Sequence, residues 1–403
     1  MNTYELLAPA GDPERLHTAL RFGADAVYVG GPKMQLRSGS VGFNMDALSQ
    51  AVRTTHNLGK KLYVTVNAFA SVRDIDTLSD YAQALSQLGV DAVIVSDLGA
   101  ISTIRRAAPS LPVHVSTQAN CLNHAAANIY ADLGASRVVL GREMSLEEIA
   151  ELRLKTPKSL ELEAFVHGAM CMAYSGRCMI SSYLTGRSAN RGACAQSCRW
   201  TYHLMEEKRP GQFLPVEEDE KGMTILSSLD MNCLDFLEEI TKAGVVSFKI
   251  EGRMKSPYYV ATVTNAYRKQ IDAICNGTST PQLTQILQQE VNACSHRPYS
   301  SGFYYGELRH HAPDDGTYLQ DCTFVGVVQG ICGNRIRFET RNRILEGDRV
   351  EILSPYSLGK SFIAKNISNR DGQPEISASR PSEIYEMDCD ENVSPGDLLR
   401  IRS

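Results

Sequence analysis

The chain has 403 residues and a formal net charge of -5 at pH 7, with 41 lysines and arginines against 46 aspartates and glutamates. A chain of this length exceeds what one ordinary hydrophobic core fills, so we expect a large domain and a smaller one. The acidic balance excludes a protein whose whole surface is basic and binds nucleic acid without selectivity. The N-terminal residues lack the basic and apolar regions of a secretory signal, and no apolar run reaches the length of a membrane span. We therefore expect a cytoplasmic protein without a membrane partner.

Eight short runs of apolar residues recur along the first part of the chain, and each predicts a β-strand. They are Glu5–Ala8, Ala26–Val29, Leu62–Val66, Ala92–Val95, Val113–Ser116, Arg137–Leu140, Leu162–Val166 and Val246–Ile250. Segments with helical periodicity lie between most of these runs. Alternation of strands and helices is typical of a parallel sheet.

Local signals mark the ends of the helices that separate these strands. Asp12 followed by Pro13, and Ser145 followed by Leu-Glu-Glu, are typical helix starts. The phrases FGADAVYVGG, LGVDAVIVSD, LGASRVVLGRE and AGVVSFKIEGR each place a glycine at the end of a helix and a strand directly after it. Eight strands over about 250 residues favour a (β/α)8 TIM-like barrel, because the G-x-G-x-x-G fingerprint of a doubly wound fold is absent after the first strand.

The pattern changes after Pro298, where strands recur without helices between them. The phrases LEGDRVEIL and SPGDLLRI both carry a Gly-Asp turn ahead of a strand. They predict a small all-β, barrel-like C-terminal domain. The predicted organisation is a (β/α)8 barrel with a cysteine-rich insertion, a helical connector and the β domain, at residues 1–276 (insertion 167–233), 277–298 and 299–403.

The segment EAFVHGAMCMAYSGRCMISSYLTGRSANRGACAQSCRW, residues 163–200, concentrates four cysteines and four arginines and has no acidic residue after Glu163. It starts in the seventh predicted strand and continues past the carboxyl end of that strand, where barrels of this kind carry their active sites. The thiols follow the spacing Cys171-x6-Cys178-x15-Cys194-x3-Cys198, and Cys233 comes later in SSLDMNCLDF. Five thiols therefore belong to one loop system.

Three interpretations of these thiols are open. A structural zinc site normally uses closely spaced pairs of cysteines, and the spacing here is wider. An iron-sulfur cluster accepts thiolates from dispersed positions, and Gly168, Gly176 and Gly192 supply main chain that can approach it closely. Free thiols without a metal are the third interpretation. Structural disulfides are disfavoured, because the cytosol is reducing.

Together with LLAPAG near the N-terminus and FKIEGRMKSPYYV around the eighth predicted strand, this segment resembles the collagenase-like peptidase family, catalogued as family thirty-two among peptidases of unknown mechanism. The resemblance covers nearly the whole chain. It implies a 4Fe-4S cluster and an oxygen-independent hydroxylation. One branch of the family converts the wobble uridine of tRNA to 5-hydroxyuridine, another hydroxylates a ribosomal RNA cytidine, and another serves ubiquinone synthesis. The RNA-modifying branches depend on prephenate.

Carried over position by position, the resemblance implies that Cys171, Cys178, Cys194 and Cys233 hold the cluster. Cys198 is the alternative fourth ligand, because some relatives use the C-x3-C pair together. A buried thiol at the start of a helix is the alternative role for Cys233.

Candidate catalytic groups lie at the seventh and eighth predicted strands: His167, Glu163, Lys249 and Glu251. His167 ends the seventh strand four residues before Cys171, and a structural histidine is the alternative. Glu163 is either a general base or a charge inside the barrel that pairs with Lys249, since barrels bury such charges only as pairs.

A two-residue period places Lys249, Glu251 and Arg253 on one side of the eighth strand. A small organic acid such as prephenate needs a guanidinium group with two parallel donors. Arg253 is the first candidate for this role, and Arg177 and Arg142 follow. The alternative is a structural ion pair between Glu251 and Arg253.

The cysteine segment also has the composition of an RNA-binding loop. Its basic and aromatic residues alternate: Arg177, Arg187, Arg191 and Arg199, with Tyr174, Tyr183 and Trp200. Such a set suits contacts with phosphates and stacking on an unpaired base. The alternative is that these arginines only cover the loop. Asn67 and Gln118, which follow the third and fifth predicted strands, are further candidates to bind the substrate.

The thiols, the basic loop and the family resemblance together predict an iron-sulfur enzyme that hydroxylates tRNA with the help of a small organic acid. A peptidase is the alternative. The chain lacks H-E-x-x-H and G-x-S-x-G, but His167 with Cys171, or with a serine of the pair Ser181 and Ser182, could meet in space. A non-catalytic iron-sulfur assembly or ubiquinone-pathway factor is a third class.

Overall fold

The computed structural model describes residues 4–36, 42–171, 175–178, 180–200, 217–219, 222–224, 229–306, 318–355 and 358–402. The chain divides into two compact units. The first unit comprises Met1–Leu20, Ala24–Lys255 and Arg297–Tyr318, and the second comprises Arg21–Gly23, Ser256–His296 and Leu319–Ser403. Across the described ranges, no helix has both the length and the apolar character that a membrane span requires.

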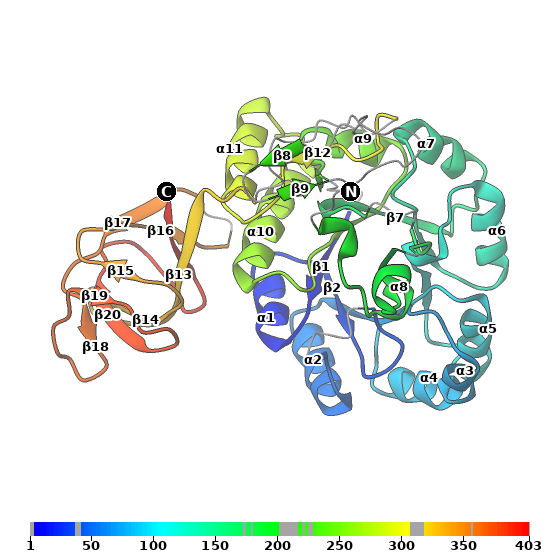
Figure 1. The fold of residues 1–403 in the computed structure, drawn as a ribbon, viewed down its shortest axis with the longest axis horizontal. Coiled ribbons are helices and arrows are strands. Elements are labelled where there is room, and N and C mark those ends of the chain that lie inside the picture. The colour runs from blue at the N-terminus through cyan, green and yellow to red at the C-terminus, as the bar shows by residue number, and fades with distance from the viewer. Residues whose placement is uncertain are drawn as a thin grey trace. The chain divides into compact units, whose positions relative to one another are not determined.

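Eight parallel strands of the first unit form a closed barrel (Figure 1). The strands are β1 (Glu5–Ala10), β2 (Ala26–Gly30), β3 (Lys61–Val66), β4 (Ala92–Val95), β5 (Val113–Val115), β6 (Arg137–Val139), β7 (Glu161–Ala169) and β11 (Ser247–Ile250). They follow one another around the barrel in chain order, and β11 pairs with both β1 and β7. All eight predicted strands are present, and the predicted TIM-like barrel is confirmed.

Helices surround this barrel (Figure 1). They include α1 (Pro13–Arg21), α2 (Met45–Asn57), α4 (Leu78–Gln87), α5 (Leu98–Ala107), α6 (His124–Asp132), α7 (Leu146–Leu154) and α9 (Leu237–Lys242). Ser145 caps α7 in a capping box with Glu148, as the sequence predicted. The glycines of the four repeated phrases have left-handed φ angles, as a turn from helix to strand requires; they are Gly23, Gly89, Gly134 and Gly244.

Strand β7 is longer than predicted and continues past the barrel. There it pairs antiparallel with β10 (Asp230–Asn232), which in turn pairs with β12 (Tyr299–Ser300). Between β7 and β10, the described residues include three short helices of the cysteine segment: α8 (Ile180–Thr185), η2 (Ala189–Arg191) and η3 (Ser197–Arg199). A short hairpin of β8 (Glu217–Asp219) and β9 (Gly222–Thr224) follows them. Because β12 pairs with β10, Arg297–Tyr318 belong to the barrel unit.

The second unit combines two helices with an all-β domain. The helices α10 (Pro257–Cys275) and α11 (Pro281–Asn292) belong to this unit and not to the barrel unit or a separate connector, so the division differs from the predicted one. The reason is a buried link, because Arg400 donates to Glu290 of α11 at 2.8 Å and the ring of Tyr258 in α10 stacks on Phe324 at 5.3 Å.

A seven-stranded sheet forms the main part of this C-terminal domain, and it confirms the predicted all-β fold. Its strands run in the order β17 (Lys360–Ile363), β16 (Arg349–Leu353), β21 (Leu398–Arg402), β13 (Cys322–Cys332), β14 (Arg335–Thr340), β20 (Ile384–Asp388) and β18 (Ser368–Asn369). The two Gly-Asp phrases lead into β16 and β21, which pair antiparallel. A smaller pair, β15 (Ile344–Leu345) and β19 (Ser377–Ala378), completes the described strands.

The interior of the (β/α)8 barrel holds a cluster of charges. Glu163 of β7 is completely buried and accepts hydrogen bonds from Lys249 of β11 at 2.9 Å and from Arg137 of β6 at 3.0 Å. Arg137 also bonds to Glu5 and Ser247. Burial by itself would raise the pKa of Glu163, but the charges of Lys249 and Arg137 outweigh burial and lower it. The predicted pairing of Glu163 with Lys249 is therefore present.

Substitution of Glu163 by glutamine should destabilise the barrel by about 3–5 kcal/mol, because two buried cations lose their shared carboxylate. Urea unfolding at pH 7 measures this change. The control is Glu151→Gln, which breaks an exposed pair with Lys155 and should change the stability little, because water and salt screen such a pair. Equal losses in the two variants would contradict the structural role of Glu163.

The same pair predicts a pH dependence. Because the pKa of Glu163 is lowered in the folded chain, its stabilisation is complete above the ordinary value of 4.5 and is lost as the pH falls through the folded value. The unfolding free energy of Glu163→Gln should therefore fall less steeply than that of the wild type below about pH 4.5.

Candidate functional site

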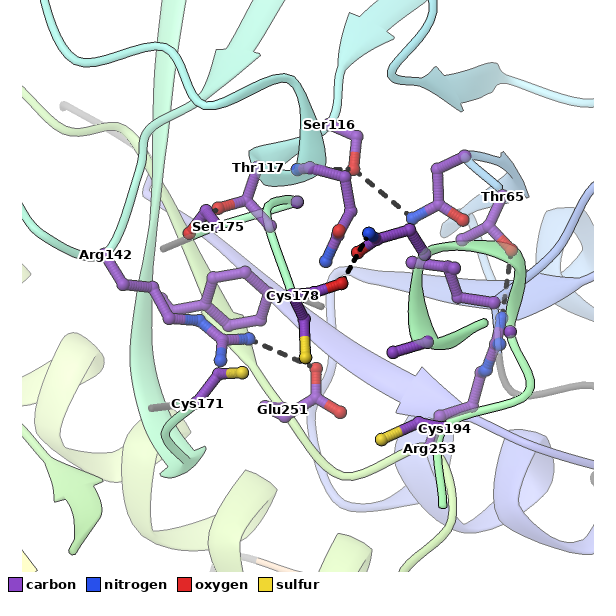
Figure 2. Close-up of a pocket in the computed structure, with 18 of the residues that line it drawn as sticks. Thr65, Ser116, Thr117, Arg142, Cys171, Ser175, Cys178, Cys194, Glu251 and Arg253 are labelled. Atoms are coloured by element: carbon purple, nitrogen blue, oxygen red, sulfur yellow. Dashed lines mark hydrogen bonds and ion pairs between the residues drawn. The ribbon is translucent and has the colours of Figure 1, made fainter. Parts of the chain in front are cut away.

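A pocket lies at the carboxyl ends of the barrel strands (Figure 2). Residues at or just after the ends of β3, β5, β6 and β11 form its walls, and the loop after β7 covers it. The cavity volume is about 160 Å³. A cavity of roughly 150 Å³ holds benzene in another protein, so this one has room for at least one ring-sized group.

Four of the five predicted cysteines line this pocket: Cys171, Cys178, Cys194 and Cys198. Figure 2 shows the sulfur atoms of Cys171, Cys178 and Cys194 directed into it, around the carboxylate of Glu251. Thiolates gathered at one cavity are the donor set of an iron-sulfur cluster. Within the part of the chain that the structure describes, no three His, Cys, Asp or Glu side chains lie close enough together to hold a single metal ion.

The fifth cysteine, Cys233, lies elsewhere. It is not among the residues that line the pocket, and its side chain is completely buried at the start of the short helix η4 (Leu234–Phe236). Its N–H donates to the carbonyl of Val166 at 3.1 Å. Burial raises the pKa of the Cys233 thiol well above its usual value. These surroundings match the alternative role of Cys233, and the structure brings Cys198 to the pocket in its place.

A tight turn docks the cysteine loop onto the barrel. The carboxylate of Glu143 accepts the N–H of Ser175 at 2.7 Å and its hydroxyl at 3.3 Å. Gly176 follows with φ of +73°, and a Cβ atom there would lie 2.0 Å from the carbonyl oxygen of Gln118. Sequence reasoning noted Gly176 but missed Glu143 and Ser175. The signal that could have found them is the Ser-Gly pair directly before Arg177, which is typical of a turn.

Cationic side chains dominate the polar lining of the pocket. Lys249 lies 4.7 Å from the centre of the Tyr28 ring and 5.4 Å from that of Phe165, while Arg142 lies 4.0 Å from Phe165. Arg253 joins them from the residues after β11, because the strand ends at Ile250 and the predicted two-residue period does not reach Arg253. Three cations thus face the single carboxylate of Glu251 among the described lining residues. The balance favours an anionic ligand.

Hydrogen bonds hold two of these cations in place (Figure 2). Nη1 of Arg253 donates to the hydroxyl of Thr65 at 2.9 Å, and the Arg253 side chain is almost completely buried. Nη1 of Arg142 donates to the carbonyl of Ala169 at 3.0 Å, and its Nη2 lies 3.5 Å from Glu251. The sequence analysis gave an ion pair of Glu251 with Arg253 as the alternative role of these residues, and the structure places Arg142 beside Glu251.

The residues of the alternative peptidase site do not meet in the pocket. His167 is buried, is not a lining residue, and lies with Nε2 3.4 Å from the hydroxyl of Tyr299. Ser181 lines the pocket, but its hydroxyl donates to the carbonyl of Arg187 at 2.7 Å. A nucleophile and its base normally lie within hydrogen-bond reach of each other. Glu163 is also absent from the lining residues, because it is completely buried inside the barrel, where it accepts a hydrogen bond from the pocket residue Lys249.

Three of the predicted RNA-binding arginines are exposed and lie outside the pocket lining: Arg177, Arg187 and Arg191. Arg191 is held at 2.6 Å from the carbonyl of Phe69 and at 3.1 Å from Asp74. Trp200 is 44% exposed. The side chains of Arg199 and Tyr183, and all of Tyr174, lie outside the described residues. Asn67 and Gln118 both line the pocket.

Comparison with known protein families identifies both parts of the chain. The model of peptidase family U32 matches residues 11–312, and the model of the C-terminal domain of that family matches residues 320–400. The chain belongs to peptidase family U32.

Curated relatives within family U32 match over most of the chain. The tRNA hydroxylation protein P1 of Bacillus subtilis is 36% identical over 98% of this chain and 94% of its own length. The tRNA hydroxylation protein P of Escherichia coli is 36% identical over 92% of this chain and 90% of its own length. The 23S rRNA 5-hydroxycytidine C2501 synthase of Escherichia coli is 38% identical over 67% of this chain and 39% of its own length.

The docked turn leads to a prediction for Gly176→Ala. The added Cβ would meet the Gln118 carbonyl in a main chain that alanine rarely adopts, and overpacking of this kind costs about 1–3 kcal/mol. Amide hydrogen exchange in residues 175–200 should become about tenfold faster or more. The matched control is Gly186→Ala, because Gly186 has φ of +69° but nothing within 4 Å of its Cβ position. Equal exchange in the two variants would show that the contact with Gln118 does not hold the loop.

Proposed function

We propose that this chain is an iron-sulfur enzyme that hydroxylates a uridine of tRNA, at the wobble position, to 5-hydroxyuridine. The observation that carries the proposal is one pocket at the barrel mouth where four thiols and three cations meet. Relatives of the chain named as tRNA hydroxylation proteins, and one named as an rRNA 5-hydroxycytidine synthase, support an RNA-modifying enzyme.

In this proposal, Cys171, Cys178 and Cys194 hold a 4Fe-4S cluster, and Cys198 is the fourth ligand. The residues fit such a group, because all four line one cavity, and the half-buried Cys194 already accepts an N–H from Gln196 at 3.3 Å. Main-chain donors to sulfur are a common feature of cluster sites. When bound, the cluster would supply electron transfer next to the substrate.

The cations of the pocket bind the small organic acid on which the reaction depends, prephenate in our proposal. Arg253 is buried and held by Thr65, so its guanidinium group is already oriented before the acid arrives. Orienting a donor group in advance lowers the entropy cost of binding. Arg142 and Lys249 flank the Phe165 ring and add positive charge on that side.

The exposed arginines of the cysteine loop contact the phosphates of the tRNA. Arg187 and Arg191 stand on residues 180–200, whose loop also carries Cys194 and Cys198. Phosphate contacts position an RNA without reading its sequence. They would hold the anticodon loop while the target base leaves the stack and enters the pocket, as enzymes that modify bases require.

Peptidase activity is not part of the proposal. The contacts of His167 with Tyr299 and of Ser181 with Arg187 use the groups that a peptidase site would need.

Deletion of the gene should abolish 5-hydroxyuridine and its derivatives in bulk tRNA, and the wild-type gene should restore them. Liquid chromatography with mass spectrometry of tRNA nucleosides measures both. A gene carrying Cys171→Ala should fail to restore them, whereas one carrying Cys275→Ala, an exposed cysteine of the second unit, should succeed. Unchanged nucleosides in the deletion strain would exclude this substrate.

The cluster is tested on protein purified without oxygen. We expect about four irons and four acid-labile sulfides per chain, with broad absorbance near roughly 400 nm. Both contents should fall to near zero in Cys171→Ala and Cys198→Ala and stay unchanged in Cys233→Ala. Loss of iron in Cys233→Ala together with its retention in Cys198→Ala would make Cys233 the fourth ligand. Zinc alone would exclude the cluster.

A further inference from the structure

Asn67 stands at the wall of the pocket, directly after β3, in a fixed position. Its main-chain carbonyl accepts a hydrogen bond from Ser96 at 3.0 Å, and its side-chain Nδ2 donates to the hydroxyl oxygen of Ser116 at 3.3 Å. Ser116 is itself buried, and its hydroxyl oxygen also accepts the N–H of Gln118 at 3.2 Å. These bonds determine which way the amide of Asn67 faces.

The other end of this amide has no hydrogen-bond partner among the residues that the structure describes. Oδ1 of Asn67 is buried and makes no hydrogen bond with any of the described residues, although the residue lines the pocket. A buried acceptor without a donor destabilises the fold, so such atoms in a binding site commonly await a ligand. No described residue supplies this donor, and a molecule bound in the pocket that Asn67 lines would be placed to supply it.

We propose that Asn67 reads the Watson-Crick edge of the target base and selects uridine over cytidine. The inference rests on the proposed function and adds the residue and the atom that choose the base. Uracil carries an N–H at N3 between two carbonyl oxygens, whereas cytosine carries an acceptor at N3. Oδ1 accepts the N3–H of uracil, and the second hydrogen of Nδ2 donates to a neighbouring carbonyl oxygen of the base.

Cytosine does not satisfy the same amide. Its N3 and the Oδ1 atom of Asn67 are both acceptors, so they repel each other and Oδ1 stays without a donor. A site that is built to hydrogen-bond one group rejects a ligand that lacks it, because the polar atoms of the site are then buried and unpaired. A carboxylate of the small acid cannot replace the base here, since an ionised carboxylate only accepts hydrogen bonds.

The experiment measures binding of three anticodon stem-loop RNAs that differ only at the wobble base: uridine, cytidine or 3-methyluridine, which lacks the N3–H. Fluorescence anisotropy at one salt concentration, without oxygen, compares them on the intact protein. Wild type should bind the uridine RNA at least about tenfold more tightly than the other two.

Two variants of Asn67 separate the role of the oxygen from that of the side chain as a whole. Asn67→Leu has a similar volume but no acceptor, and it should bind the uridine and cytidine RNAs equally. Asn67→Asp keeps an acceptor at this position and should still prefer uridine. The matched control is Asn128→Leu, because Asn128 on α6 also has a buried Oδ1 without a partner among the described residues but does not line the pocket. It should behave as wild type does.

The outcomes distinguish the two proposals. Equal binding of uridine and cytidine RNA by the wild type, or an unchanged preference in Asn67→Leu, would overturn the role of Asn67 and leave tRNA hydroxylation in place. An unchanged preference together with weaker binding of prephenate in Asn67→Leu would assign Asn67 to the acid and overturn base reading. No measurable binding of any of the RNAs would overturn both proposals.

Discussion

The pocket depends on the buried ion pair between Glu163 and Lys249. A carboxylate without exposure to water is stable inside a barrel only when cations neutralise it, and Lys249 and Arg137 do so from the strands on either side. The pair exists because β11 closes the barrel against β7. Closure thus places the Lys249 ammonium between the rings of Tyr28 and Phe165 and makes it part of the pocket.

Two parts of the chain form the pocket: the barrel supplies the cations and the amide groups, and a docked loop supplies the thiols. The cations and the amide groups lie on the barrel strands or within three residues of their ends, so the sheet sets their positions. The thiols stand mainly on the loop after β7, where few regular hydrogen bonds exist, and particular contacts replace them. Glu143 holds the turn at Ser175, and Gly176 allows the main chain to meet Gln118 closely. A cluster at this place would join the two parts.

Charge is distributed unevenly in a chain with a net charge of -5. Residues 164–200 contain four arginines and no acidic side chain. Of these arginines, Arg177, Arg187 and Arg191 have described side chains, and all three are exposed. A polyanion such as tRNA responds to local positive charge within about a Debye length of roughly 8–10 Å, so the overall acidic balance does not oppose its binding. In our proposal the cations inside the pocket bind a smaller anion, since a folded RNA helix is too wide to enter.

The sequence by itself determined the barrel, because the periodicity of its strands and the glycine turns between them are local signals. It also singled out Lys249, Glu251 and Arg253, which all line the pocket, although β11 ends at Ile250 and strand alternation does not extend to the last two. Only the tertiary structure decided which groups meet across the barrel. It put Cys198 in the pocket, buried Cys233 against β7, set His167 against Tyr299 and left Oδ1 of Asn67 without a partner among the described residues. Contacts between residues far apart in the chain depend on register and loop docking, which no local pattern encodes.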